Sequence, residues 1–270
     1  ALPYSVADVR LSRSQPLMLL AEQLIAPILA DAEHTGCPVI ALCNGMGGTP
    51  LMELYIMDAD GGNKKQLTRT AASEGAVAWT PSGKAIAYLR EGKLWNIAPD
   101  GSSEKQVSDI EQSIEGFLYA PAGNKILLVI PTKIEKCMNS DIYEDLDKAK
   151  AYVYDDLMYR HWDTWKDGNY SHLYLADVKD DKVKAVEDIM PGEPFDSPVK
   201  PFGGMEQITW SPDGSTIVYT CKKLSGLDYA FQTNSNLYAY TLADKKTRLL
   251  TPDMPGYDQN PQFSPDGKKL

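Results

Sequence analysis

The tract Trp210-Ser-Pro-Asp-Gly-Ser215, followed by the apolar residues 216–220, decides the fold. Proline fixes φ at about −65° at the first corner of a turn, and Asp-Gly tolerates the left-handed geometry that comes next. The residues after the turn alternate as they do in a half-buried strand. The tract therefore predicts a hairpin that joins two antiparallel strands.

The same pattern of an aromatic residue, a small residue, proline, a small or acidic residue and glycine occurs at four places in the chain. The first three are each followed by an alternating apolar strand, at 85–89, 126–130 and 216–220. Repetition of one hairpin at several places indicates a repeat architecture. The four tracts are Trp79-Thr-Pro-Ser-Gly-Lys84, Tyr119-Ala-Pro-Ala-Gly-Asn124, Trp210-Ser-Pro-Asp-Gly-Ser215 and Phe263-Ser-Pro-Asp-Gly-Lys268.

A second repeated tract, a short strand that begins with leucine, precedes each hairpin. It occurs at 54–58, 94–98, 173–177 and 237–241, and outgoing strands follow at 65–68, 105–108 and 248–251. The distance from leucine to the hairpin aromatic is 25 residues in the first two repeats (54 to 79, 94 to 119). It is 37 in the third (173 to 210) and 26 in the fourth (237 to 263).

Four antiparallel strands in a repeat of about 40 residues are typical of a propeller blade. We therefore predict a mainly β protein, an incomplete β-propeller of about three and a half four-stranded blades over residues 54–270. The alternative is a β-sandwich with unrelated Pro-Asp-Gly turns. Because propellers close with about four to eight blades, we expect this chain to be part of a longer parent.

An insert separates the second and third blades. The second and third hairpins lie 91 residues apart (119 to 210), against 40 for the first and second (79 to 119). The excess lies mainly in residues 133–170, whose middle is rich in Asp, Glu, Lys and Ala and predicts one or two short helices before an aromatic strand or loop. Long insertions in a rigid β scaffold are where function concentrates.

The densest group of reactive side chains in the insert is Tyr159-Arg-His-Trp-Asp163. Arg160 can pair with a carboxylate in bidentate fashion, and His161 can titrate near neutral pH. Asp155, Asp156 and Asp163 can receive a cationic amine. These five residues are the candidate substrate-binding site; the alternative is that they only tie the insert to its blade through aromatic packing and salt bridges.

Residues 54–270, with these hairpins and this insert, resemble the N-terminal propeller of the prolyl oligopeptidase family of serine peptidases. The string Tyr154-Asp-Asp-Leu-Met-Tyr-Arg-His-Trp-Asp-Thr-Trp165 is similar to the dipeptidyl peptidase V and acylaminoacyl-peptidase branch, whereas the Pro-Asp-Gly hairpins are shared with TolB-type propellers. The resemblance implies a propeller that admits short peptides and helps to hold their amino-terminal end. It also implies acyl transfer by a serine in a separate α/β-hydrolase domain. No G-x-S-x-G occurs in the 270 residues, so no catalytic residue is assigned.

The first 53 residues follow a different pattern. Apolar residues at three- and four-residue spacing predict a helix over 16–33, and residues 38–43 predict a uniformly apolar strand of the kind buried in a parallel sheet. A Gly-rich turn then leads to a helix start with Thr49 as N-cap and Pro50 at the first helical position. The pattern predicts a short α/β segment over 1–53, separate from the propeller.

Residues 17–57 also resemble a piece of the substrate-binding subunit of dihydroxyacetone kinases, through AEQLIAPILAD and NGMGGTPLMELYIM. No position matches the substrate histidine of that family, and His34 is not given its role. Residues 52–57 finish this pattern as a helix but begin the first blade as a strand. Such a local conflict favours a composite chain, fused or misassigned over 1–53; the alternative is a native propeller with an unusual α/β leader.

Composition limits the partners. The formal charge is −10, which argues against a nucleic-acid backbone as the main partner, and no apolar run reaches the roughly 18 residues of a membrane span. The four cysteines lack metal or redox spacing, and the Asp58-Ala-Asp-Gly-Gly62 turn lacks the spacing of a calcium loop. We therefore expect no metal and no cofactor.

Three functions stay open, in this order: the substrate-gating propeller of a serine exopeptidase that cleaves short peptides, a non-catalytic TolB-like propeller that binds a protein or peptide, and a dihydroxyacetone kinase fragment. The resemblance implies a secreted or periplasmic location, with a cytoplasmic one as the alternative, and is compatible with a homodimer.

Overall fold

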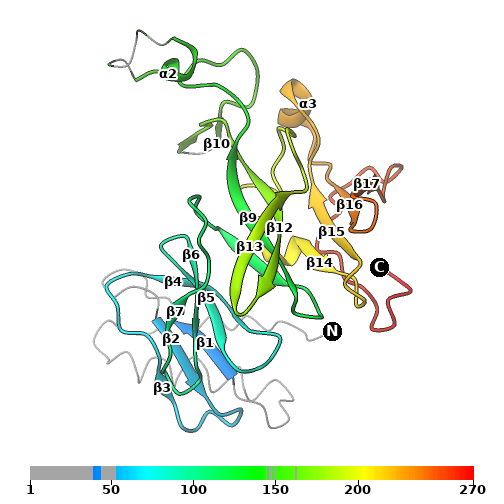
Figure 1. Cartoon of the computed structure of the whole chain (residues 1–270). Coiled ribbons are helices and arrows are strands. Elements are labelled where there is room, and N and C mark those ends of the chain that lie inside the picture. The colour runs from blue at the N-terminus through cyan, green and yellow to red at the C-terminus, as the bar shows by residue number, and fades with distance from the viewer. Residues whose placement is uncertain (1–38, 44–52, 144, 146–147, 149, 162) are drawn as a thin grey trace, which may run out of the picture. The chain divides into compact units, whose positions relative to one another are not determined.

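The computed structural model describes residues 39–43, 53–143, 145, 148, 150–161 and 163–270 (Figure 1). The chain divides into two compact units, residues 1–107 and 108–270. Each unit is described by itself.

The first unit contains two antiparallel sheets. The three-stranded sheet has the order β1-β2-β3, and the four-stranded sheet has the order β4-β5-β6-β7. Their shared core is built from Leu54, Leu67, Ile86, Tyr88 and Ile97. The strands are β1 (Val39–Cys43), β2 (Glu53–Met57), β3 (Lys65–Gln66), β4 (Glu74–Trp79), β5 (Ile86–Arg90), β6 (Lys93–Ile97) and β7 (Lys105–Gln106).

The second unit contains two four-stranded antiparallel sheets, ordered β13-β12-β9-β8 and β14-β15-β16-β17. Their strands are β8 (Gly116–Tyr119), β9 (Lys125–Lys133), β12 (Asn169–Lys179), β13 (Lys182–Asp188), β14 (Ile208–Trp210), β15 (Thr216–Cys221), β16 (Asn236–Thr241) and β17 (Lys246–Leu249). The remaining elements are α2 (Asn139–Ile142), β10 (Arg160–His161), β11 (Thr164–Trp165), the 3₁₀ turn η1 (Met205–Gln207) and α3 (Gly226–Phe231).

The repeated hairpin is confirmed at all four places. In each, the small residue before proline donates its N–H to the carbonyl five residues on, and the glycine donates to the small residue's carbonyl. In the third hairpin these bonds are Ser211 to Thr216, 2.9 Å, and Gly214 to Ser211, 2.8 Å. The glycines Gly83, Gly123, Gly214 and Gly267 all have φ between 68° and 73°, which is the left-handed geometry that Asp-Gly and Ser-Gly predict.

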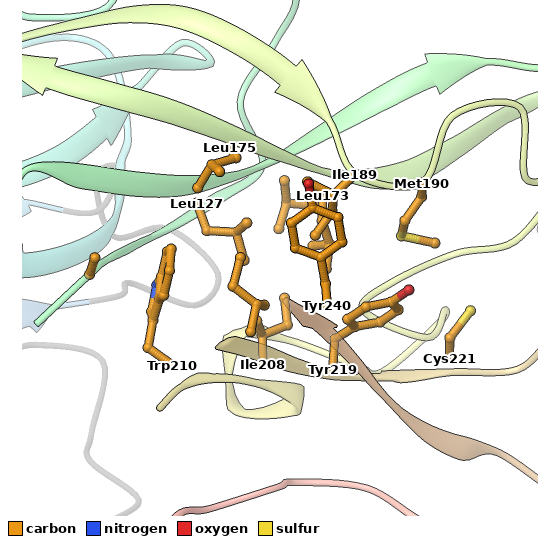
Figure 2. Packing of buried hydrophobic residues seen from close by; sticks show 13 residues of the cluster. Leu127, Leu173, Leu175, Ile189, Met190, Ile208, Trp210, Tyr219, Cys221 and Tyr240 are labelled. Carbon is orange, nitrogen blue, oxygen red and sulfur yellow. The ribbon is translucent and has the colours of Figure 1, made fainter. Parts of the chain in front are cut away.

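The hairpins bring apolar faces together. Leu127, Leu173 and Leu175 of one sheet face Ile208 and Tyr219 of the other across the core of the second unit (Figure 2). The indole of Trp210, the hairpin aromatic, is 7% exposed and donates from Nε1 to the Leu118 carbonyl at 3.3 Å. The mainly β, blade-based fold class is therefore confirmed.

Residues 52–57, whose sequence has both a helix and a strand pattern, form a strand over their described part. Glu53–Met57 forms β2, so the helix that the kinase-like pattern predicts at 52–57 is wrong over these residues. The apolar strand expected at 38–43 is present as β1, but its expected parallel setting is wrong because β1 pairs antiparallel with β2, Val39 opposite Met57. Pairing with β1 and β3 outweighs the local helix signal. The helix predicted at 16–33 and the cap at Thr49 lie outside the described residues, and the division of the chain at residue 53 stays a prediction.

The insert at 133–170 contains a short helix, as predicted. Among its described residues, the four-residue α2 is the helix, and β10 and β11 form a small hairpin in which Arg160 lies opposite Trp165. The aromatic strand expected after the helix is thus present. In the described part of the chain, no helix has the length and apolar character needed to cross a membrane.

Candidate functional site

The insert leaves the scaffold between two long paired strands. β9 and β12 pair from Lys125 opposite Asp177 to Lys133 opposite Asn169. Just beyond the ladder, the carbonyl of Gly168 accepts from the N–H groups of Ile134 and Glu135 at 2.9 and 3.1 Å. Gly168 has φ +81°, and a Cβ there would lie 2.1 Å from the Glu135 carbonyl oxygen. Only glycine fits, so the base of the insert is held rigidly.

A group of stacked aromatic rings, here called the aromatic cluster, lies at the first wall of the site: Tyr154 and Trp165 line the cavity, and Tyr152 and Tyr159 pack against them. The ring centres of Tyr154 and Trp165 are 6.3 Å apart with planes 13° apart, and Tyr159 lies 6.1 Å from Trp165. The Tyr154 hydroxyl donates to the Lys166 carbonyl at 2.5 Å, and burial raises its pKa to about 12. The guanidinium of Arg160 lies 5.1 Å from the Trp165 ring centre, within cation–π range.

The segment after β13, residues 189–201, forms the second wall. It continues along the edge of β12, where Ser197 donates its N–H to the Ser171 carbonyl and Ser171 donates to Asp196 Oδ1 at 2.8 Å. Burial raises the pKa of Asp196, and Lys200 at 3.3 Å only partly offsets that effect. A carboxylate kept in a site where its charged form is disfavoured is typical of a functional position.

The third wall is α3 with the residues before it. Lys222 donates from Nζ to the carbonyls of Tyr229 and Gln232 at 2.7 and 2.5 Å, at the end of the helix, and burial lowers its pKa. At the other end, Gly226 has φ +56° and a Cβ there would lie 2.8 Å from Asp156 Oδ2. The insert and α3 therefore meet through Asp156, at one end of the strands of this unit (Figure 1).

These three walls enclose a cavity of about 690 Å³. All five predicted site residues, Asp155, Asp156, Arg160, His161 and Asp163, line it and are exposed. Charges of both signs therefore face the same space, beside the rings of Tyr154 and Trp165. Within the described residues, no three His, Cys, Asp or Glu side chains are grouped so that they could hold a metal ion.

Sequence reasoning missed the residues from the other two walls. Asp196 and Lys200 come from the Pro-rich segment, and Lys222 and Tyr229 come from α3 and its approach. One signal could have found the first pair: the third repeat has 37 residues between its leucine and its hairpin, where the others have 25 or 26. The extra residues contain Pro191, Pro194, Pro198 and Pro201 and build the second wall.

Comparison with curated proteins covers most of the chain. Over 222 residues, 81% of this chain, it is 41% identical to dipeptidyl-peptidase 5 of Porphyromonas gingivalis. The chain is similar to dipeptidyl-peptidase 5. The enzyme of that name from Porphyromonas endodontalis is 37% identical over the same share, and the one from Aspergillus oryzae is 26% identical over 250 residues. The resemblance of residues 54–270 to this peptidase branch is thus confirmed.

The chain spans about a third of the length of its dipeptidyl-peptidase 5 relatives, and 32% of the length of the two bacterial ones. Solved structures with a related arrangement include TolB from Acinetobacter baumannii, 17% identical, covering 85% of this chain and 45% of that one, with a TM-score of 0.46. Another is the Pyrococcus horikoshii acylaminoacyl peptidase, 18% identical, covering 74% and 27%, with a TM-score of 0.48. No family model matches the chain.

Proposed function

We propose that this chain is the substrate-gating propeller part of a serine exopeptidase that cleaves short peptides. Acyl transfer would take place in an α/β-hydrolase domain outside this sequence, since the 270 residues contain no G-x-S-x-G nucleophile motif. The similarity to dipeptidyl-peptidase 5, of whose length the chain spans about a third, supports this assignment. The secreted or periplasmic location and the homodimer stay predictions.

The observation that carries the proposal is the cavity of the second unit. A peptide's amino-terminal end offers an ammonium group, backbone carbonyls and a side chain, and the cavity presents a matching group for each. Asp155, Asp156 and Asp163 face the space as carboxylates for the ammonium, and Arg160 is a donor for carbonyl oxygen. The aromatic cluster offers a surface for the side chain. The volume lies in the usual range for small-molecule sites, about 300 to 1,000 Å³.

The half-buried Asp196 adds a carboxylate with a distinct role. Its Oδ1 is already bonded to the Ser171 N–H and lies 3.3 Å from Lys200. An ammonium group that entered the cavity would favour the charged form that burial opposes. In this proposal Asp196 draws the ammonium inward, while Asp155 and Asp156 close over it from the insert.

Calorimetric titration with the dipeptide amide Ala-Phe-NH₂ tests the proposal, with N-acetyl-Ala-Phe-NH₂ as the matched ligand that lacks the charge. We expect the free amine to bind at least about tenfold more tightly, because a hydrogen bond to a charged group contributes about 1.5–3 kcal/mol. The double variant Asp155→Asn, Asp156→Asn should reduce that preference, while Asp163 and Asp196 retain part of it.

The control variant is Asp253→Asn, which changes an exposed aspartate outside the cavity lining. It should keep the preference for the free amine. Equal binding of the two ligands by the wild-type chain would contradict an amino-end site and favour the alternative, a propeller that binds partners without reading the peptide terminus.

A further inference from the structure

His172 lies on β12 behind the cavity and does not line it. Its side chain is fully buried. Both of its ring nitrogens lie at hydrogen-bond distance from an oxygen. Nδ1 lies 2.8 Å from Asp188 Oδ2 at the end of β13, and Nε2 lies 2.8 Å from the backbone carbonyl of Glu193.

Neither oxygen brings a hydrogen of its own. A carbonyl only accepts, and a carboxylate at neutral pH only accepts; the second oxygen of Asp188 already accepts from the Met190 N–H at 2.8 Å. A neutral imidazole carries one N–H and would leave one of these acceptors without a donor. The geometry therefore requires the doubly protonated ring. Burial alone would lower the pKa of His172, but the bonds to Asp188 and Glu193 outweigh it and raise the pKa above its usual value.

The imidazolium lies where the second wall is attached to the sheet. On either side of Glu193, Ile189 donates its N–H to the Leu173 carbonyl and Ser197 donates to the Ser171 carbonyl, both at 2.9 Å. The side-chain bond from His172 to Glu193 fixes the stretch between these two backbone bonds. The residues that follow it, Pro194, Phe195 and Asp196, line the cavity.

The charged groups around the ring come from three elements. Asp188 ends β13, Glu193 belongs to the 189–201 segment, and Lys223 follows β15 and pairs with Glu193 at 2.6 Å. On the other side of β12, the residue opposite His172 is Ile130 of β9, and this side chain carries no charge. Because Lys223 neutralises Glu193, the carboxylate of Asp188 is the group that holds the proton on the ring.

We propose that His172 is a positioning residue of the site, a proton-dependent tie that fixes the 189–201 wall and with it the half-buried carboxylate of Asp196. The tie is complete at pH values below the histidine pKa and is lost as the pH rises through it. The cavity then has a well-placed wall below that pKa and a looser one above it. The inference rests on the proposed function only for the identity of what the cavity binds.

Hydrogen exchange of the Ile189 and Ser197 amides tests the proposal without any ligand. Pulse labelling of the full chain between pH 6 and pH 10, corrected for the intrinsic exchange rate, should show protection that falls at least about tenfold as the ring loses its proton, as expected for one charge-assisted hydrogen bond. Amides of the β15–β16 ladder should keep their protection over the same range.

Three variants separate the tie from a general loss of structure. His172→Gln keeps a non-titrating donor near the Nε2 position, so protection should become independent of pH and stay near the acid value. His172→Phe keeps the ring volume but removes both donors and should be unprotected throughout. Asp188→Asn should move the wild-type midpoint to lower pH. Wild-type protection that does not change with pH, or an unmoved midpoint in Asp188→Asn, would overturn the inference.

Titration with Ala-Phe-NH₂ over the same pH range gives the second readout. The amine of the ligand itself loses its charge at about pH 7.7–8.0, so affinity should fall with pH in both proteins. The fall should be steeper in the wild type, where it should follow the protection of Ser197, than in His172→Gln, where only the titration of the ligand remains. Protection that depends on pH without any dipeptide binding would leave the tie standing and overturn the proposed function. Binding with protection that is independent of pH would do the reverse.

Discussion

The blade sheets and the cavity rim of the second unit are held by different forces. Leu127 and Tyr219 are fully buried in an apolar core between two regular sheets. The rim is held by the carbonyl of Gly168, the half-buried Lys222, His172 and stacked aromatic rings, and much of its surface is exposed. Apolar packing is non-directional and makes a large contribution to the free energy of folding. A few hydrogen bonds fix the geometry of a segment but each adds only about 0.5–1.5 kcal/mol to stability. We infer that the sheets carry stability and the rim carries binding.

The largest effect should come from the core. Leu127→Ala is expected to lower the free energy of unfolding by about 2–5 kcal/mol, since it removes a fully buried side chain and leaves a cavity. Urea unfolding measures this, with Leu249→Ala on β17, where the leucine is 41% exposed, as the matched control. A loss in Leu127→Ala no greater than in the control would break the division between sheets and rim.

Two glycines with positive φ sharpen the comparison. Gly168→Ala should destabilise the chain by more than Gly214→Ala. The backbone cost of the left-handed geometry, about 1–2 kcal/mol, is common to both. At Gly168 the new Cβ would also meet the Glu135 carbonyl oxygen at 2.1 Å, while at Gly214 the nearest atom is Pro121 Cδ at 3.7 Å. The two midpoints of urea unfolding give the order, and equal losses would show that the base of the insert is not rigid.

The charged form of Asp196 should lower the free energy of unfolding of the chain, although the proposed site needs that charge. Because burial raises the pKa of Asp196 in the folded chain, the charged form costs stability at pH values above that pKa. Asp196→Asn keeps an acceptor for the Ser171 N–H, so it should be more stable than the wild type at pH 7. The difference should vanish as the pH falls below the unfolded value of about 3.9. Urea unfolding at pH 3, 5 and 7 measures it; a less stable variant at pH 7 would show that the Lys200 pair outweighs burial.

The smallest effect on stability should come from Arg160. Its side chain is exposed and packs over Trp165, so Arg160→Ala should change the free energy of unfolding by no more than about 0.5 kcal/mol. Binding of Ala-Phe-NH₂ should nevertheless weaken. A stability loss comparable to that of Leu127→Ala would instead support the alternative that this residue only ties the insert to its blade.

The sheets could be predicted from the sequence because their turns are encoded locally. Pro-Asp-Gly fixes a hairpin within six residues, and the strands on either side follow from alternation. The segment at 53–57 is different. Its helix signal was local, but its strand state depends on pairing with β1 and β3, and only the repeat in the sequence indicated it.

The site was predicted only in part, because some of its residues are close in the sequence and others come together only in the folded chain. Asp155, Asp156, Arg160, His161 and Asp163 lie close together in the sequence, so their clustering was visible. Asp196 reaches the same cavity through backbone bonds to β12, and the longer third repeat marks its segment but not its contact with the insert. Tyr229 reaches the cavity through the course of α3, which no spacing in the chain reveals. The imidazolium of His172 depends on two acceptors 16 and 21 residues away.

The most direct test of the division between scaffold and site is a crystal structure of the chain soaked with Ala-Phe-NH₂. We expect the dipeptide in the cavity between the insert, the 189–201 segment and α3. Its ammonium nitrogen should lie within about 3 Å of a carboxylate oxygen of Asp155, Asp156, Asp163 or Asp196. Density for the dipeptide elsewhere on the chain, with this cavity empty, would contradict the account.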